Sequence, residues 1–400
     1  MVELTRTASA VLLACALALS VPLGAAAPAA SATVIAPSSP GHAAAGPVAT
    51  RARLPEPTGP YAVGSSVLHL VDRSRPDPWV PTADGRELMV TVHYPAARHG
   101  AGRPARYATT EEARLLVRGL GIESSVPARE LAAMRTHSRV DARPAADGRH
   151  PLVLLSPGFG ASRYTLTHLA EDLASRGYVV ASVDHAYESF GTAVPGGRML
   201  TCVACEVVDA GADPARVTSA RAADAAFVLD RLTGPRAAWR HARMIDTARV
   251  GMAGHSIGGA SAATAMAADR RIDAGIDMDG AFWGPLPPDG LGGRPFMMLG
   301  TDDEVHRPGG TDTTWDATWP RLGGWKRWLT VAGANHFTFS DSPVILGHFG
   351  LPGPALPSER AVALTRTYVA AFFDRHLRGL PQPLLDGPSA AHPEMTFHTP

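Results

Sequence analysis

The fold of this 400-residue chain is decided by RVGMAGHSIGGA, residues 249–260. Residues 249–253 form a short, mostly apolar run that suits a strand, and the small residues after Ser256 suit the start of a helix. Between them lies the pattern G-x-S-x-G, residues 254–258. A serine is a weak nucleophile unless a sharp strand-to-helix turn presents it over the helix N-terminus, and the flanking glycines avoid clashes there. The stretch therefore predicts a nucleophilic Ser256.

The rest of the chain alternates short β-branched runs with helical stretches, the pattern of a mostly parallel sheet covered on both faces. We expect strands at residues 88–93, 151–155, 178–183, 249–253, 272–278, 295–299 and 327–331. Helices are expected at residues 214–232 and 358–377, although Arg221 and Asp224 interrupt the apolar stripe of the first. The predicted class is α/β with an α/β-hydrolase fold, in a single domain over residues 54–400.

Two excursions interrupt the alternation, near residues 106–147 and 187–213. The second follows the carboxyl end of a predicted strand, which is where ligands bind in open α/β sheets. Both excursions are therefore candidates for the rim of a substrate pocket.

The N-terminus has the features of an export signal. Arg6 precedes an apolar run at residues 8–21, and the small residues 30–32 suit a signal peptidase. The run is too short for a stable membrane span. We expect a signal peptide at residues 1–32, a flexible leader at 33–53 and a secreted protein.

The charge balance favours no polyanionic partner. The formal net charge is zero and the pI is about 7.3, so nothing favours nucleic acid or an acidic membrane surface. We expect a lipid or small ester as the partner and a monomeric chain.

Two cysteines, Cys202 and Cys205, remain once the expected signal peptide is removed. Their spacing allows a redox pair, half of a zinc site or a short disulfide. The sequence has no second pair of zinc ligands at motif spacing. Because the pair follows the turn at residues 195–197, we expect it in a loop rather than at a helix start, where redox pairs lie. In an oxidising compartment this favours a structural disulfide.

An oxyanion turn is expected at Ser156-Pro157-Gly158-Phe159-Gly160, which follows a predicted strand and precedes a helix. At this place the fold presents a backbone N–H to the tetrahedral oxyanion. Phe159 is the expected donor, and Ile257, directly after the nucleophile, supplies the second N–H.

The general base in this fold comes after the last strand, in the chain order Ser, acid, His. His336 fits this place, whereas His306 comes too early for a base. Two carboxylates compete as the acid, because Asp279 and Asp303 each follow a predicted strand. Either can fix the imidazole tautomer and stabilise the imidazolium.

Over most of the mature chain the sequence resembles the plasma and intracellular type II platelet-activating factor acetylhydrolases and the bacterial proteins grouped with them. The likeness includes LPEPTGPYAVG at residues 54–64, the turn at 156–160 and GHSIGG at 254–259. In that family the acid follows the strand after the nucleophile helix, so the resemblance implies Asp279 beside His336.

The resemblance also implies Phe159 and Ile257 as oxyanion donors and a short sn-2 acyl ester of a phospholipid as substrate. The mechanism needs no metal and no cofactor.

Bacterial triacylglycerol lipases, cutinases and polyester hydrolases share the G-H-S-x-G-G motif and place their acid where Asp303 stands, so such an enzyme is the alternative. A non-catalytic binding protein of this fold would typically lack a triad member. Trp283 is expected in the core, with the acyl pocket as the alternative.

Overall fold

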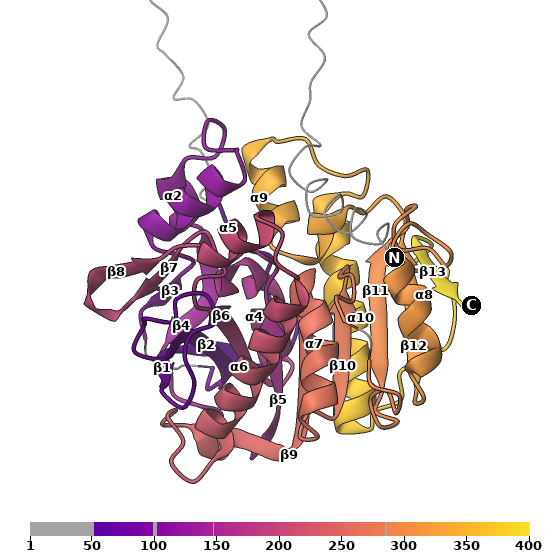
Figure 1. Cartoon of the computed structure of the whole chain (residues 1–400), viewed down its shortest axis with the longest axis horizontal. Coiled ribbons are helices and arrows are strands. Elements are labelled where there is room, and N and C mark those ends of the chain that lie inside the picture. The colour runs from indigo at the N-terminus through magenta and orange to yellow at the C-terminus, as the bar shows by residue number, and fades with distance from the viewer. Residues whose placement is uncertain (1–51, 99–101, 147, 285) are drawn as a thin grey trace, which may run out of the picture. The chain divides into compact units, whose positions relative to one another are not determined.

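An eleven-stranded sheet with the order β13-β12-β11-β10-β9-β5-β6-β2-β1-β4-β3 runs through the described part of the chain (Figure 1). The computed structural model describes residues 52–400 except 99–101, 147 and 285. The expected signal peptide and nearly all of the expected leader lie outside the described residues. Residues 52–400 form one compact unit.

The strands and helices have the following bounds. The sheet contains β1 (Ala62–Asp72), β2 (Arg86–Ala96), β3 (Pro104–Arg106), β4 (Arg135–Val140), β5 (His150–Ser156), β6 (Val179–His185), β9 (Ile245–His255), β10 (Ala274–Met278), β11 (Phe296–Thr301), β12 (Lys326–Val331) and β13 (Met395–His398). A separate hairpin pairs β7 (Thr192–Val194) with β8 (Arg198–Leu200). The helices are α2 (Thr110–Gly119), α3 (Ala128–Ala132), α4 (Thr167–Ser175), α5 (Val203–Asp209), α6 (Ala215–Thr233), α7 (Ile257–Ala268), α8 (Thr313–Thr318), α9 (Ser342–Phe349) and α10 (Ser358–Arg378).

The predicted fold class is confirmed. Strands β5, β6 and β9 to β12 pair in parallel, and antiparallel strands extend the sheet on both sides. Each predicted strand and both predicted helices are present. The sequence did not predict β1, β3, β4 or β13, which lie in the outer parts of the sheet.

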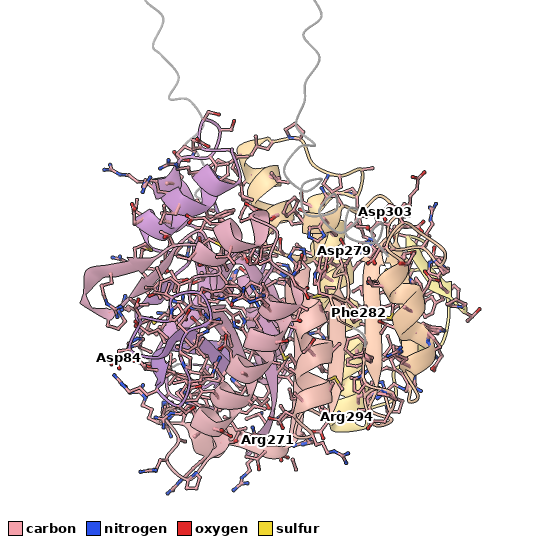
Figure 2. The ribbon with its side chains drawn as sticks, in the orientation of Figure 1. Asp84, Arg271, Asp279, Phe282, Arg294 and Asp303 are labelled. Atoms are coloured by element: carbon pink, nitrogen blue, oxygen red, sulfur yellow. A yellow bond between two sulfur atoms is a disulfide. The ribbon has the colours of Figure 1, made fainter. Side chains whose placement is uncertain are left out.

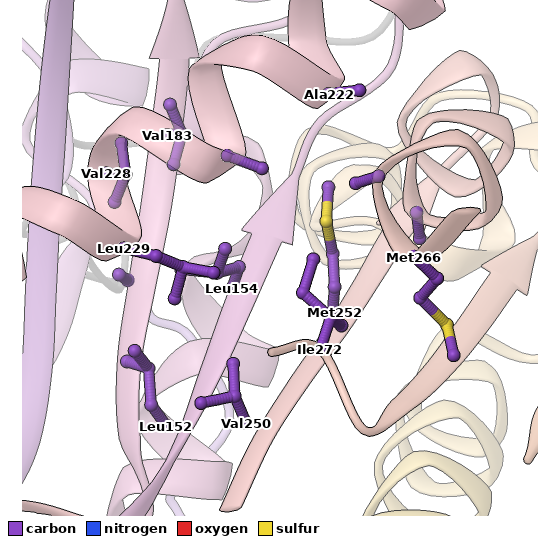
Figure 3. Packing of buried hydrophobic residues seen from close by; sticks show 14 of the residues in the cluster. Leu152, Leu154, Val183, Ala222, Val228, Leu229, Val250, Met252, Met266 and Ile272 are labelled. Carbon is purple, nitrogen blue, oxygen red and sulfur yellow. The ribbon is translucent and has the colours of Figure 1, made fainter. Parts of the chain in front are cut away.

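Alternate residues of the central strands pack on opposite faces of the sheet, as strand geometry requires. Leu152 and Leu154 belong to a core with side chains of α6 and α7, such as Leu229 (Figure 3). Val153 and Leu155 belong to a second core with side chains of α4 and α10. Because both faces are buried, the central strands are apolar almost throughout.

The winding of the chain reverses at β5. From β5 the chain passes through α4 to β6 on one side, and it returns through α6 to β9 on the other side. The carboxyl ends of β5 and β9 therefore flank the switch point at which open α/β sheets bind ligands. Ser256 follows the end of β9, and the predicted oxyanion turn begins at the end of β5.

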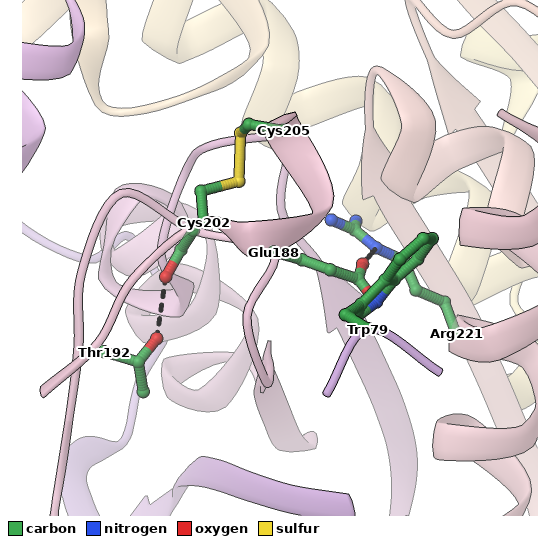
Figure 4. Close-up of a disulfide and its surroundings, with 7 residues drawn as sticks. Trp79, Glu188, Thr192, Cys202, Cys205 and Arg221 are labelled. Atoms are coloured by element: carbon green, nitrogen blue, oxygen red, sulfur yellow. Dashed lines mark hydrogen bonds and ion pairs between the residues drawn. A yellow bond between two sulfur atoms is a disulfide. The ribbon is translucent and has the colours of Figure 1, made fainter. Parts of the chain in front are cut away.

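Both excursions contain regular structure, and one prediction about them is wrong. Cys202 and Cys205 form a disulfide with Cα atoms 5.2 Å apart (Figure 4). The pair does not lie in a loop, because Cys202 directly precedes α5 and Cys205 lies in the first turn of that helix. The turn at Pro195–Gly197 only closes the β7–β8 hairpin, and Thr201 alone separates β8 from Cys202.

Among the described residues, none of the helices combines the length and apolar character that crossing a bilayer requires.

Candidate active site

Ser256 lies on a strained turn between β9 and α7. Its φ and ψ are 57° and −131°, a conformation that costs about 1–3 kcal/mol. The carbonyl of Met278 accepts its N–H at 2.8 Å. A Cβ on Gly254 would lie 2.1 Å from the carbonyl carbon of Gly258, and a Cβ on Gly258 would lie 2.1 Å from the Ser156 oxygen. The turn therefore requires glycine at both positions, for the steric reason that the motif predicted.

His336 and Asp279 are hydrogen-bonded to each other. The distance from His336 Nδ1 to Asp279 Oδ2 is 2.7 Å, and Asp279 Oδ1 accepts the N–H of Thr301 at 2.7 Å. Because a carboxylate only accepts hydrogen bonds, the proton of neutral His336 lies on Nδ1 and Nε2 keeps its lone pair. This is the tautomer that a general base needs. No hydrogen bond joins Ser256 Oγ to His336 within the described residues; such contacts often form only when substrate binds.

His255, next to the serine, holds the loop that carries His336. Its Nε2 lies 2.6 Å from the carbonyl oxygen of His336, and the two ring centroids are 4.8 Å apart. Burial, with the charge of His336, lowers the pKa of His255 to about 3. His255 is therefore neutral and donates from Nε2. Sequence reasoning gave this residue no role, and its only signal was its place in the G-H-S motif.

The competing carboxylate, Asp303, accepts hydrogen bonds from residues of the turn that follows β11. It accepts hydrogen bonds from Thr301 Oγ1 at 2.7 Å and from the N–H groups of Val305 at 2.9 Å and His306 at 3.1 Å. Its side chain is 46% exposed, whereas that of Asp279 is 1% exposed. Both residues follow the carboxyl ends of neighbouring strands, β10 and β11 (Figure 2). The geometry favours Asp279 as the partner of His336.

A second histidine contacts the other oxygen of Asp279. His306 Nδ1 lies 3.2 Å from Asp279 Oδ1 and 3.1 Å from Thr301 Oγ1. Although burial opposes its charge, Asp279 and Asp303 raise the pKa of His306. Although burial opposes ionisation of Asp279, His306 and His336 lower the pKa of that carboxyl. The acid is therefore ionised while it orients His336.

The predicted oxyanion donors lie at the two sides of the switch point. Phe159 is in the turn after β5 and Ile257 is the first residue of α7. Within the described residues, neither N–H donates a backbone hydrogen bond. A Cβ on Gly158 would lie 3.0 Å from His255 Nδ1 and 3.5 Å from Ser256 Cβ, so the turn runs close to Ser256. Both N–H groups are thus available to a ligand.

Aromatic side chains near these residues in sequence stay accessible. Phe159, Trp283 and Phe337 are each partly exposed. The expectation of Trp283 in the core is wrong. Its neighbour Phe282 takes that place, 6% exposed and packed against Phe296.

The fold and the geometry at this switch point define an α/β-hydrolase, and comparison with known proteins gives the family. The model of the family described as platelet-activating factor acetylhydrolase, isoform II, matches residues 48–194. A protein of Arthroderma benhamiae described as a probable 1-alkyl-2-acetylglycerophosphocholine esterase is 30% identical over 380 residues, which cover 86% of this chain and 93% of that protein. The solved structure of a ferulic acid esterase from Streptomyces cinnamoneus is 47% identical, with a TM-score of 0.78, over 88% of this chain and 100% of that one. The chain belongs to the platelet-activating factor acetylhydrolase isoform II family and is a carboxylic ester hydrolase.

Proposed function

We propose that the protein cleaves its ester with Ser256 as nucleophile, His336 as general base and Asp279 as the acid that orients the base. The observation that carries this proposal is the strained Ser256 turn at the switch point, with the 2.7 Å His336–Asp279 hydrogen bond on the same edge of the sheet. Ser256 attacks the ester carbonyl, and His336 Nε2 takes its proton. The N–H groups of Phe159 and Ile257 bind the oxyanion.

The remaining steps follow from the same residues. The imidazolium of His336 returns the proton to the leaving alcohol, and the acyl group stays on Ser256. Water then attacks the acyl-enzyme and gives its proton to His336, which releases the acid and restores the serine hydroxyl.

The substrate we propose is a phospholipid with a short sn-2 acyl group, cleaved outside the cell. Support for the substrate comes from the family and from the relative named for 1-alkyl-2-acetylglycerophosphocholine. Support for export comes from the expected signal peptide at residues 1–32, and the Cys202–Cys205 disulfide suits an oxidising compartment.

Hydrolysis of a feruloyl ester is a second candidate. The solved ferulic acid esterase is 47% identical to this chain, against 30% for the phospholipid esterase relative. A feruloyl group differs from an acetyl group by its aromatic ring, which aromatic side chains bind by stacking or edge contacts. The partly exposed Phe159, Trp283 and Phe337 can provide such contacts.

The deciding experiment compares initial rates of the mature protein on a 2-acetyl ether phospholipid, methyl ferulate and a medium-chain triacylglycerol, each with a Ser256→Ala control. A serine-dependent kcat/KM at least about tenfold higher for the phospholipid supports the proposal. A preference for methyl ferulate selects the second candidate, and a preference for triacylglycerol selects a lipase. Export is tested by expressing the full chain in a secreting host; a product retained in the cytoplasm with residues 1–32 intact contradicts it.

A further inference from the structure

A cluster of buried charges lies around the start of the oxyanion turn. Its members come from β2, β6, α6 and the loops before β2 and after β6, and they are at most 3% exposed: Asp77, Arg86, His185, Glu188, Arg221 and Asp224. Burying charges is costly unless each is paired and hydrogen-bonded, and an equivalent apolar core is often as stable. Stability alone therefore does not explain the cluster.

Arg221 of α6 binds the oxyanion turn directly. Its Nη1 donates to the carbonyl oxygen of Pro157 and, at 3.1 Å, to Ser156 Oγ. Its Nε donates to Glu188 Oε2 at 2.7 Å, and Figure 4 shows the pair. One planar guanidinium thus joins two residues of the turn to a carboxylate from another segment.

Glu188 binds the other end of the same turn. Its main-chain oxygen accepts the N–H of Gly160 at 2.9 Å. Its side-chain Oε1 accepts from Trp79 Nε1 at 2.8 Å and from Arg86 Nη2 at 2.6 Å. Although burial favours the protonated acid, Arg86 and Arg221 hold the pKa of Glu188 below its usual value. The Arg221–Glu188 pair therefore holds the turn on both sides of Phe159.

The protons of the surrounding network have one consistent arrangement. Burial, with the charge of Arg221, lowers the pKa of His185, which is therefore neutral. His185 Nδ1 donates to Asp224 Oδ2 at 2.7 Å, so its Nε2 accepts from Ser156 Oγ at 3.0 Å. Ser156 Oγ then accepts from Arg221. Ser156, His185 and Asp224 repeat the hydrogen-bond order of a catalytic triad, but their burial keeps them from any ester.

We infer that Arg221 is a positioning residue, which acts through the oxyanion turn to fix the N–H of Phe159. This inference rests on the proposed function. Preorganised N–H donors act most strongly on the charge of the transition state. Loss of the Arg221 contacts should therefore lower kcat and leave KM nearly unchanged, because the uncharged substrate carbonyl gains little from the donor.

The test is Arg221→Lys, which keeps the charge but not the planar set of donors. The matched control is Arg366→Lys, since Arg366 is also buried and donates to main-chain oxygens, those of Pro55, Glu56 and His168, away from the oxyanion turn. We expect Arg221→Lys to lower kcat by about tenfold to a hundredfold, with KM within about threefold. Affinity for an alkyl trifluoromethyl ketone, which forms an oxyanion on the serine, should fall by the same factor. Arg366→Lys should change neither quantity.

Thermal melting establishes that each variant is folded. If Arg221→Lys does not fold, Ser156→Ala removes one of the Arg221 acceptors and should still lower kcat and ketone affinity together. Equal losses in Arg221→Lys and Arg366→Lys, or a rise in KM in place of a loss of kcat, would overturn the inference. Activity that survives Ser256→Ala would instead overturn the proposed function.

Discussion

His336 Nδ1 lies 2.7 Å from Asp279 Oδ2, although the two residues are 57 positions apart in the chain. The sheet order makes this contact possible, because Asp279 follows β10 and His336 follows β12, with only β11 between these strands. The carboxyl ends of parallel strands meet at one edge of the sheet.

The first prediction separates the two candidate acids. Asp279→Asn keeps the shape of the carboxyl but favours the wrong tautomer of His336, so kcat should fall by about 10⁴-fold. Asp303→Asn should lower kcat by less than about tenfold, because Asp303 binds its own turn. Steady-state rates on one ester measure both. A larger loss in Asp303→Asn would reassign the acid.

The second prediction concerns Asp277, buried beside the site. Burial and the charge of Asp279 raise the pKa of Asp277 well above its usual value, and its Oδ2 has no partner within the described residues. The folded state thus keeps a proton that the unfolded chain loses above about pH 4. Asp277 therefore lowers the free energy of unfolding as the pH rises, by about 1.4 kcal/mol per pH unit. Asp277→Asn should remove that slope and keep activity within about threefold.

Urea unfolding at pH 5 and pH 8 measures this effect. The stability of Asp277→Asn relative to wild type should increase with pH, whereas Asp289→Asn, at an exposed position, should follow the wild type. Parallel pH profiles for Asp277→Asn and wild type would show that Asp277 is ionised in the folded protein.

The third prediction concerns loss of stability in mild acid. Burial is the largest cause that lowers the pKa of His93 to about 4 and the pKa values of His168 and His255 to about 3. The unfolded chain binds these protons below about pH 6.5, but the folded protein does not. Stability should therefore fall with pH from 6.5 downwards, by about 2 kcal/mol per histidine at pH 5. His93→Leu should make this fall shallower in urea unfolding, and His348→Leu, at an exposed position, should not.

The fourth prediction concerns the disulfide. Cys202 and Cys205 are separated by three positions, so the closed loop is short and its entropic stabilisation is about 2 kcal/mol. The double variant Cys202→Ser, Cys205→Ser should melt a few degrees lower and keep its activity within about twofold. A redox role would appear as an activity of the wild type that changes more than about tenfold with dithiothreitol and does not change in the variant.

The turn at Ser256 and the loop of His336 were predictable because their signals are local. The glycines around Ser256, and the place of His336 after β12, the last strand that the sequence predicts, can be read along the chain. The contact that distinguishes Asp279 from Asp303 cannot be read in this way. Both residues follow strands, and they differ in their burial and in their hydrogen-bond partners, which the sequence does not show. Arg221 illustrates the same limit. In sequence it only interrupts the apolar stripe of α6, and its pairing cannot be read along the chain because its partner Glu188 comes from another segment.

The missed strands have a similar explanation. β1 contains Gly64-Ser65-Ser66, which weakens an apolar pattern, yet the strand pairs with β2 over its whole length. β13 has four residues and is defined by its pairing with β12. The sequence favours a loop for the cysteine pair because it does not reveal that the turn at Pro195–Gly197 closes the β7–β8 hairpin.

Trapping the acyl-enzyme shows directly whether Ser256 is the nucleophile. The mature protein is mixed with p-nitrophenyl acetate, quenched in acid within the first turnover and analysed by intact-mass and peptide mass spectrometry, beside Ser256→Ala. We expect one acetyl group per chain, on Ser256 of the wild type and absent from the variant. Acetylation of another residue, or hydrolysis by Ser256→Ala at the wild-type rate, would contradict it.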